Sequence, residues 1–236
     1  FSGLRKDKRN ELIDLYLELG GTQDSYYGQN PKQLKKMQKM MKKMMVDFWA
    51  GFGGMSEAFF QSPGWDVLRI DNNPLLSEVP QMVLADCMTL EPYNLGTNLQ
   101  IEYVHCSFPC TEFSQAFNAP GPNAKRQGLE FKPDLRPALK AIELIERIKP
   151  KYWSFENVKG SIPHLTPILG EPAIIIGSHV FWGNFPRFKY NLPLEFKKDM
   201  DKRHSPLRAN YRAKIPLGIS KVMLNAIESQ KCITDY

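Results

Sequence analysis

The sequence predicts an α/β fold built around a parallel β-sheet, and three observations lead to this prediction. Short apolar stretches typical of buried strands recur along the chain, at residues 46–50, 65–70, 81–85, 101–106 and 152–156. Helical patterns separate several of them, most clearly the amphipathic pattern at residues 136–148. Glycine, acidic residues or cysteine follow the predicted strands, at the sheet edge where open α/β folds bind ligands. Strands that alternate with helices are typical of a parallel sheet.

Composition agrees with a folded, mildly basic protein. The 236 residues suit one domain with a small appendage, 42% of them are hydrophobic, and the formal net charge is +6. This charge suits a polyanionic partner such as nucleic acid, although many soluble proteins are equally basic. Four cysteines without an expected secretory leader do not indicate a disulfide framework. We therefore expect a reducing, cytoplasmic setting, and no apolar run is long enough to cross a bilayer.

Changes in sequence character divide the chain into four expected parts. Residues 1–45 form a basic, helical extension, residues 46–184 the α/β core, residues 185–212 a basic and irregular segment, and residues 213–236 a helix that completes the core. In the extension, a helix is expected to begin at Asn30-Pro31 and to continue through Met44. Its many lysines either form a solvated face or contact phosphates.

The first three predicted strands end in residues that suit a nucleotide-like ligand. Residues 47–54 read Asp-Phe-Trp-Ala-Gly-Phe-Gly-Gly, which places a glycine-rich turn between a strand and a helix. Asp71 ends the second strand, where a carboxylate can hold a ribose hydroxyl pair, and Asp86 ends the third, where it can accept from an adenine amino group. Each feature alone is more often a turn or a cap, but together they predict a binding site.

Two chemically reactive groups follow the next two strands. Pro109-Cys110 follows the fourth strand, and Glu156 ends the fifth. A thiol and a carboxyl group on neighbouring strand ends provide a nucleophile and an acid, although a free cysteine is more often a small core residue. His105, Cys106 and Cys110 have poor spacing for zinc, so we predict no metal site.

These motifs, in this order, resemble those of DNA cytosine-5 methyltransferases. The resemblance covers residues 46–184 and 211–227, and it is most specific at Pro109-Cys110 and at Glu156-Asn157-Val158. Residues 181–184 and 214–216 are similar to later segments of the family. The resemblance implies a Rossmann-like class I S-adenosylmethionine-dependent methyltransferase sheet with a reduced recognition region. The compact size is similar to that of bacteriophage enzymes, for which restriction-modification or host-defence evasion are the expected roles.

The resemblance also implies roles for individual residues. Cys110 would add to carbon 6 of a cytosine flipped out of duplex DNA, Glu156 would hold its N3 and exocyclic amine, and His179 would replace a family arginine. The methyl donor S-adenosyl-L-methionine, which becomes S-adenosyl-L-homocysteine, would contact Phe48, Ala50, Gly51, Gly53, Gly54, Asp71, Asn72, Asp86, Cys87 and Pro109. The nucleic-acid contacts would come from Ser114, Asn157, Arg187, Lys189, Arg203 and Arg208.

Several departures from the family pattern leave alternatives open. Thr111 stands where the family has glutamine, and Gly177-Ser178-His179 replaces an Arg-x-Arg pair. The basic segment at 185–212 is far shorter than the family's DNA-reading region, and phosphate contacts position without specifying sequence. We therefore expect a short recognition sequence, or specificity from residues 1–45 or a protein partner. The alternatives are the same chemistry on RNA or a cytidine nucleotide, transfer of a group other than methyl, and a catalytically weak DNA-binding regulator.

Overall fold

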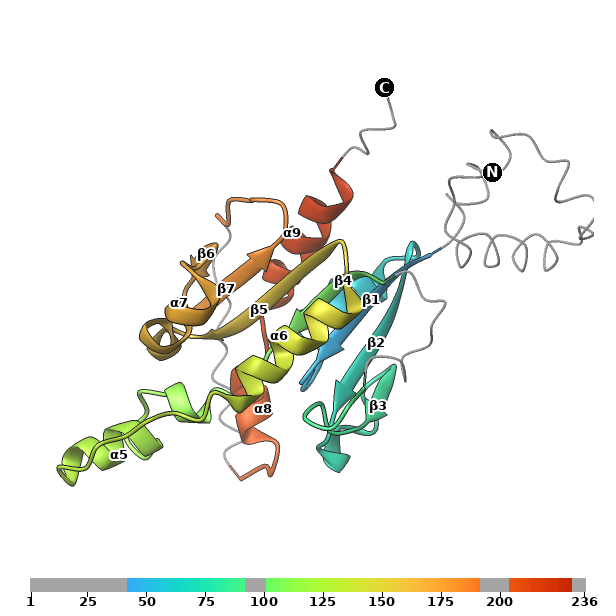
Figure 1. Ribbon diagram of the computed structural model, residues 1–236. Coiled ribbons are helices and arrows are strands. Elements are labelled where there is room, and N and C mark those ends of the chain that lie inside the picture. The colour runs from blue at the N-terminus through green and yellow to red at the C-terminus, as the bar shows by residue number, and fades with distance from the viewer. Residues whose placement is uncertain (1–41, 92–100, 192–203, 231–236) are drawn as a thin grey trace, which may run out of the picture.

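A seven-stranded sheet in the order β3-β2-β1-β4-β5-β7-β6 forms the centre of the molecule (Figure 1). The structure is a computed structural model that describes residues 42–91, 101–191 and 204–230. The strands are β1 (Lys43–Phe48), β2 (Trp65–Asp71), β3 (Met82–Leu84), β4 (Ile101–Cys106), β5 (Tyr152–Val158), β6 (Ile174–Ile176) and β7 (His179–Asn184). The first five are parallel, whereas β7 runs antiparallel to both β5 and β6. The predicted α/β class and Rossmann-like sheet are therefore confirmed.

Helices cover both faces of this sheet, as Figure 1 shows. The described helices are α4 (Glu57–Gln61), α5 (Pro120–Arg126), α6 (Arg136–Ile148), α7 (Ile162–Leu169), α8 (Arg208–Ala213) and α9 (Leu217–Glu228). Short 3-10 turns also occur, namely η1 (Pro74–Leu76), η3 (Thr111–Phe113) and η4 (Lys159–Ser161). Within the described ranges, no helix has the length and apolar character that crossing a membrane requires.

The strand alternation divides the apolar side chains between two cores. Val46 and Val104 pack with α6 residues such as Leu144 in one core. The neighbouring residues Met45 and Tyr103 point to the opposite face and pack with α4 and α9 in the other core. Both faces of β1 and β4 are buried, so that apolar residues do not alternate with exposed polar ones, and the polar residues Asp47 and His105 are buried with them.

The structure differs from the sequence expectations at three places. The prediction of a helix that continues through Met44 is wrong at its end, because Lys43 and Met44 belong to β1 and pair with β2. The rest of that predicted helix falls in residues 1–41, which lie outside the described part. The β6-β7 hairpin was not expected, since β6 has only three residues. The segment expected to be irregular up to residue 212 contains α8. In each case pairing or packing with distant residues decides the conformation over the local pattern.

The carboxyl-terminal part of the chain packs directly against the glycine-rich turn after β1. Ser220 on α9 accepts a hydrogen bond from the Ala58 amide at 3.0 Å and donates one to the Met55 carbonyl. The backbone of Ile215, just before α9, touches Gly54 so closely that an added Cβ there would lie 2.6 Å from the Ile215 nitrogen. The turn therefore takes its position from both β1 and the last helix.

We predict that Gly54→Ala destabilises the protein, because the new methyl group meets backbone atoms that cannot rotate away. The expected loss in free energy of unfolding is about 1 to 3 kcal/mol, measured by urea denaturation. Gly64→Ala is the matched control, since nothing lies within 4 Å of the Cβ position there. Equal stability of the two variants would contradict the packing described for Gly54.

Candidate active site

The carboxyl ends of β1, β2, β4 and β5 surround a cavity of about 720 Å³. This volume is in the range of small-molecule sites. The start of β7 and residues 209–215 complete its wall. The lining includes many of the residues predicted from the sequence: Ala50, Gly51, Gly54, Asp71, Asn72, Pro109, Cys110, Ser114, Glu156 and His179.

Four predicted cofactor residues do not line this cavity. Phe48 is fully buried in the core beneath it, and the aromatic ring that reaches the cavity belongs to Trp49. Gly53 lies behind the turn, where Arg69 occupies the space that a side chain would need. Asp86 is exposed and caps its own turn by accepting from the Met88 amide, and Cys87 is buried beside β2.

The predicted nucleic-acid residues have different surroundings. Asn157 is buried and donates to the Phe108 carbonyl at 3.0 Å, so that it fixes the segment leading to Cys110. Arg187 and Lys189, beyond β7, are exposed, and so is Arg208 at the start of α8. Arg203 lies outside the described residues.

The turn after β1 is held in a tight conformation by Asp71. One carboxylate oxygen of Asp71 accepts from the Gly51 amide at 2.9 Å, and the other accepts from the Asn73 amide at 3.0 Å. Trp49 has φ of 53°, which is rare for a residue with a side chain and costs on the order of 1 to 3 kcal/mol. Such conformations persist only where the surroundings enforce them, and they gather at functional sites.

Glu156 and His179 form a buried pair at the back of the cavity. The Nδ1 atom of His179 lies 2.7 Å from Oε1 of Glu156, and both side chains are about one-tenth exposed (8% and 11%). The antiparallel pairing of β5 with β7 brings them together, since Glu156 lies opposite Phe181 and His179 opposite Val158. Glu156 can therefore present its second carboxylate oxygen to a ligand.

Cys110 is held in a half-buried position before the short η3 turn. Burial raises the pKa of its thiol, and the negative charge of Glu156 raises it further. The thiol is therefore protonated at neutral pH. Because the thiolate is the nucleophilic form, the cysteine needs a change in its surroundings before it can attack.

Several cavity residues were missed by the sequence reasoning. These are Trp49, Ser107, Asn118 and Asn210; Arg212, from the basic segment that the sequence singled out for phosphate contacts, lines the cavity as well. The alternation of side chains along a strand could have indicated Trp49. If Val46 faces the core, Phe48 must face it too, and Trp49 then points away from that core. The positions of Asn210 and Arg212 depend on how the chain returns after β7, and no local pattern encodes that return.

A second hollow of about 920 Å³ lies beside the cavity and shares Ser114 with it. Its lining includes Lys125 and Arg126 from α5 and His164 from α7. Near it, Arg126 stacks at 3.8 Å over the ring of Phe117, which is 72% exposed. Basic side chains with an exposed aromatic ring are typical of surfaces that bind nucleic acid strands.

Among the described residues, no cluster of three His, Cys, Asp or Glu side chains is placed to hold a metal ion. The cavity instead combines glycine backbone, an aromatic ring, carboxylates and a thiol. Asp71 keeps unused lone pairs on both oxygens, because each carboxylate oxygen has two. These groups fit a nucleoside-bearing ligand next to the reactive thiol.

Comparisons with known proteins give one family match. The sequence model of C-5 cytosine-specific DNA methylase matches residues 43–166, more than half of the chain. No match to a curated protein was found. Among solved structures, the chain is similar to the Entamoeba histolytica methyltransferase EhMeth, with 14% identity and a TM-score of 0.43, over 67% of this chain and 58% of that one. It is also similar to a human protein, methyltransferase 10 domain containing protein, with 12% identity and a TM-score of 0.35, over 76% and 82% of the two chains. The chain thus spans less than two thirds of the Entamoeba protein.

We predict that Glu156→Gln speeds alkylation of Cys110 by iodoacetamide at pH 8 several-fold. Removing the negative charge lowers the pKa of the thiol toward its ordinary value, so that more thiolate is present at that pH. The rate is followed by mass spectrometry of the peptide that contains Cys110.

Glu112→Gln is the control, because Glu112 lies in the adjacent η3 turn but does not shift the pKa of Cys110. Cys87 and Cys106 should stay unmodified in every variant, since both thiols are buried and burial raises the pKa of each. An alkylation rate that Glu156→Gln leaves unchanged would contradict the proposed electrostatic coupling.

Proposed function

Since this chain belongs to the C-5 cytosine-specific DNA methylase family, we propose that it transfers a methyl group from S-adenosyl-L-methionine to carbon 5 of cytosine in DNA, through a covalent adduct at Cys110. Family membership itself supports an enzyme that methylates cytosine with this donor. The observation that carries the finer proposal is the single cavity that Cys110, Glu156 and Asp71 line together.

Cys110 and Glu156 act together on the cytosine ring in this proposal. The Cys110 thiolate forms a bond from Sγ to carbon 6, and the ring electrons move toward carbon 5 and N3. A proton held between Glu156 and N3 would offset the negative charge that develops on the ring, while the carboxyl group accepts a hydrogen bond from the exocyclic amine. Carbon 5 would then bond the methyl group as the methyl–sulfur bond of the donor breaks. The carbon 5 proton would pass to solvent, and the bond from Sγ to carbon 6 would break to restore the ring and the thiolate. Covalent addition is required because carbon 5 of an aromatic cytosine is a poor nucleophile.

The methyl donor fits at the glycine-rich side of the cavity. When bound, S-adenosyl-L-methionine supplies an electrophilic methyl group on a sulfonium. Asp71 would hold the ribose hydroxyls while it keeps the turn in place through the Gly51 amide. Trp49, whose ring is 6.3 Å from that of Phe108, provides an aromatic surface for the adenine.

A nucleic-acid strand is the substrate that the surroundings of the cavity favour. Arg212 and Lys214 line the cavity itself, and Lys125 and Arg126 line the adjacent hollow. Arg187, Lys189 and Arg208 are exposed and free of the core, so they would contact phosphates. Only residues 185–207 connect β7 to α8, which supports a short recognition sequence or a partner that supplies specificity.

RNA is the second candidate substrate. The short connection between β7 and α8 favours it, because a small recognition region offers few side chains to read a duplex groove. The chemistry at Cys110 and Glu156 would be the same, so the two candidates differ only in the strand that presents the cytosine.

We predict that the protein becomes trapped on duplex DNA that contains 5-fluorocytosine when the methyl donor is present. Fluorine at carbon 5 blocks the final elimination, so the protein and the DNA stay joined on a denaturing gel. Cys110→Ser should abolish the band, whereas Cys232→Ser should leave it intact. Trapping only on RNA would favour the second candidate, and a band that persists in Cys110→Ser would refute the adduct.

We also predict that Asp71→Ala weakens binding of S-adenosyl-L-methionine by about 10- to 100-fold, which corresponds to a lost charged hydrogen bond. Isothermal titration calorimetry on the protein without nucleic acid measures this directly. Asp66→Ala is the control, because Asp66 lies on the same strand but is exposed and pairs with Lys42. Equal affinities in the two variants would show that the ribose is bound elsewhere.

A further inference from the structure

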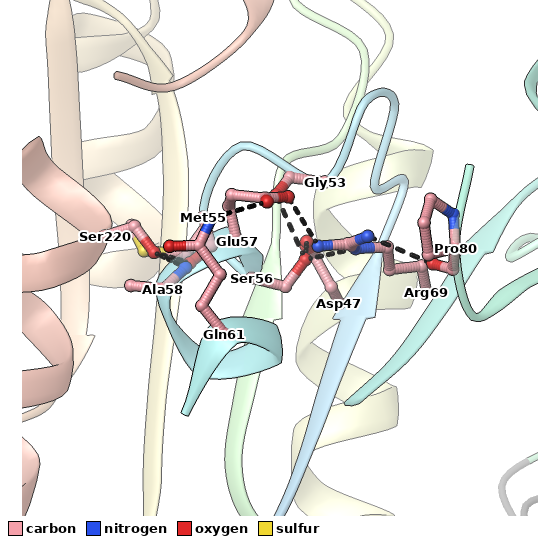
Figure 2. Close-up of polar contacts among 10 residues, drawn as sticks. All are labelled: Asp47, Gly53, Met55, Ser56, Glu57, Ala58, Gln61, Arg69, Pro80 and Ser220. Atoms are coloured by element: carbon pink, nitrogen blue, oxygen red, sulfur yellow. Dashed lines mark hydrogen bonds and ion pairs between the residues drawn. The ribbon is translucent and has the colours of Figure 1, made fainter. Parts of the chain in front are cut away.

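Asp47 is a buried carboxylate in the cavity wall that the proposed reaction does not use. It is the second-last residue of β1, only 1% exposed, and it lines the same cavity as Asp71 and Cys110. Its Oδ2 atom accepts a hydrogen bond from the Ser56 hydroxyl at 2.6 Å (Figure 2). A buried carboxylate is costly unless a positive charge or hydrogen bonds compensate it, so its position needs an explanation.

The nearest cation does not pair with Asp47. Arg69 is fully buried, and its Nε atom donates to Ser56 at 2.8 Å rather than to the carboxylate. Its other nitrogens donate to the Pro80 carbonyl and to Glu57, with which Arg69 forms a salt bridge at 3.0 Å (Figure 2). The charge of Arg69 is therefore compensated by Glu57. The Ser56 hydroxyl, which accepts from Arg69 and donates to Asp47, is the hydrogen-bonded link between the two.

Arg212 and Lys214 line the same cavity but are not among the causes of the pKa shift of Asp47, and the other titratable groups that interact with Asp47 carry no positive charge. They are Asp71 on β2, Cys87, and the β4 residues Tyr103 and Cys106. Burial raises the pKa of Asp47 to about 7, while the Ser56 hydrogen bond and Arg69 oppose this rise and Asp71 adds to it. Near neutral pH the carboxyl group is thus poised between its two protonation states.

Ser56 connects the protonation state of Asp47 to the glycine-rich turn. Its hydroxyl has one proton and two acceptors in reach, Asp47 at 2.6 Å and the Gly53 carbonyl at 3.2 Å. An ionised Asp47 takes this proton. A protonated Asp47 instead donates to the Ser56 oxygen, and the Ser56 proton is then free to turn to Gly53. Gly53 also packs against the Arg69 side chain, which donates to the same Ser56 oxygen.

We propose that Asp47 is the counter-charge by which this site distinguishes the sulfonium of the methyl donor from the neutral sulfur of the product. The inference rests on the proposed function, because it takes the donor to be S-adenosyl-L-methionine. The two ligands share their ammonium and carboxylate groups and differ by one methyl group and one positive charge. The sulfonium favours ionised Asp47, whereas the neutral thioether lets the buried carboxyl group take up a proton from solvent.

The sign of the pH dependence follows from this linkage. Below pH 7, Asp47 is mostly protonated, so binding of the donor must release a proton and is weakened. Above pH 7, the carboxylate is already ionised and the affinity levels off. Between pH 6 and pH 8 the donor should therefore bind about tenfold more tightly, and the affinity for the product should change little.

Isothermal titration calorimetry at pH 6.5, in buffers of different ionisation enthalpy, counts the protons released on binding. The wild-type protein should release protons when it binds S-adenosyl-L-methionine and none when it binds S-adenosyl-L-homocysteine. Asp47→Asn, which keeps the shape and an acceptor for Ser56, should abolish the release and reduce the preference for the donor over the product. Asp66→Asn is the control, since that carboxylate is exposed on the neighbouring strand β2 and pairs with Lys42.

The wild-type measurement tests the inference even if Asp47→Asn does not fold. Equal proton release with both ligands, no release with either, or release that persists in a folded Asp47→Asn would each overturn the role of Asp47. Binding of neither ligand would overturn the proposed function as well, so the two failures are distinguishable.

Discussion

The parallel pairing of β2, β1, β4 and β5 determines where the chemistry of this protein can take place. Each of these strands ends at the same edge of the sheet, and their registers align Phe48 with both Ile70 and Cys106, and Cys106 with Phe155. The residues that directly follow these positions therefore meet. This constraint brings a glycine-rich turn, the Asp71 carboxylate, a thiol and a second carboxylate into one cavity although they are spread over more than a hundred residues of sequence.

The reversed strand β7 adds a residue to this edge in a way that a parallel strand cannot. Because β7 is antiparallel to β5, its amino-terminal end lies at the edge where the other strands have their carboxyl ends. His179, the first residue of β7, can thus form a hydrogen bond with Glu156 on β5, on the side of β5 that faces away from β4. The chain then returns through α8, and Phe52 in the turn packs against Tyr211 at a ring distance of 4.4 Å.

The sequence predicted those parts of the fold and of the site that depend on local patterns. Apolar stretches followed by glycine, aspartate or cysteine located the parallel strands and their ends. Alternation along β1 places Phe48 in the core with Val46, but the direction of the Trp49 side chain depends on a positive φ that only the surrounding turn enforces. The sequence did not indicate that Arg69, in the middle of an apolar stretch, is buried, since its partners Ser56, Glu57 and Pro80 come from separate segments.

The electrostatics of the cavity link the reactivity of the thiol to the presence of ligands. Asp47, Asp71 and Glu156 line the cavity together with Cys110, and the thiol beside Glu156 stays protonated because burial and a like charge both raise its pKa. In the proposed function, a cationic donor would compensate the carboxylates on one side, and the exocyclic amine of a cytosine would donate a hydrogen bond to Glu156 on the other. In the proposed reaction, the thiol therefore loses its proton only when both ligands are in place. A site of this kind protects a reactive cysteine from other electrophiles by its charge as well as by its shape.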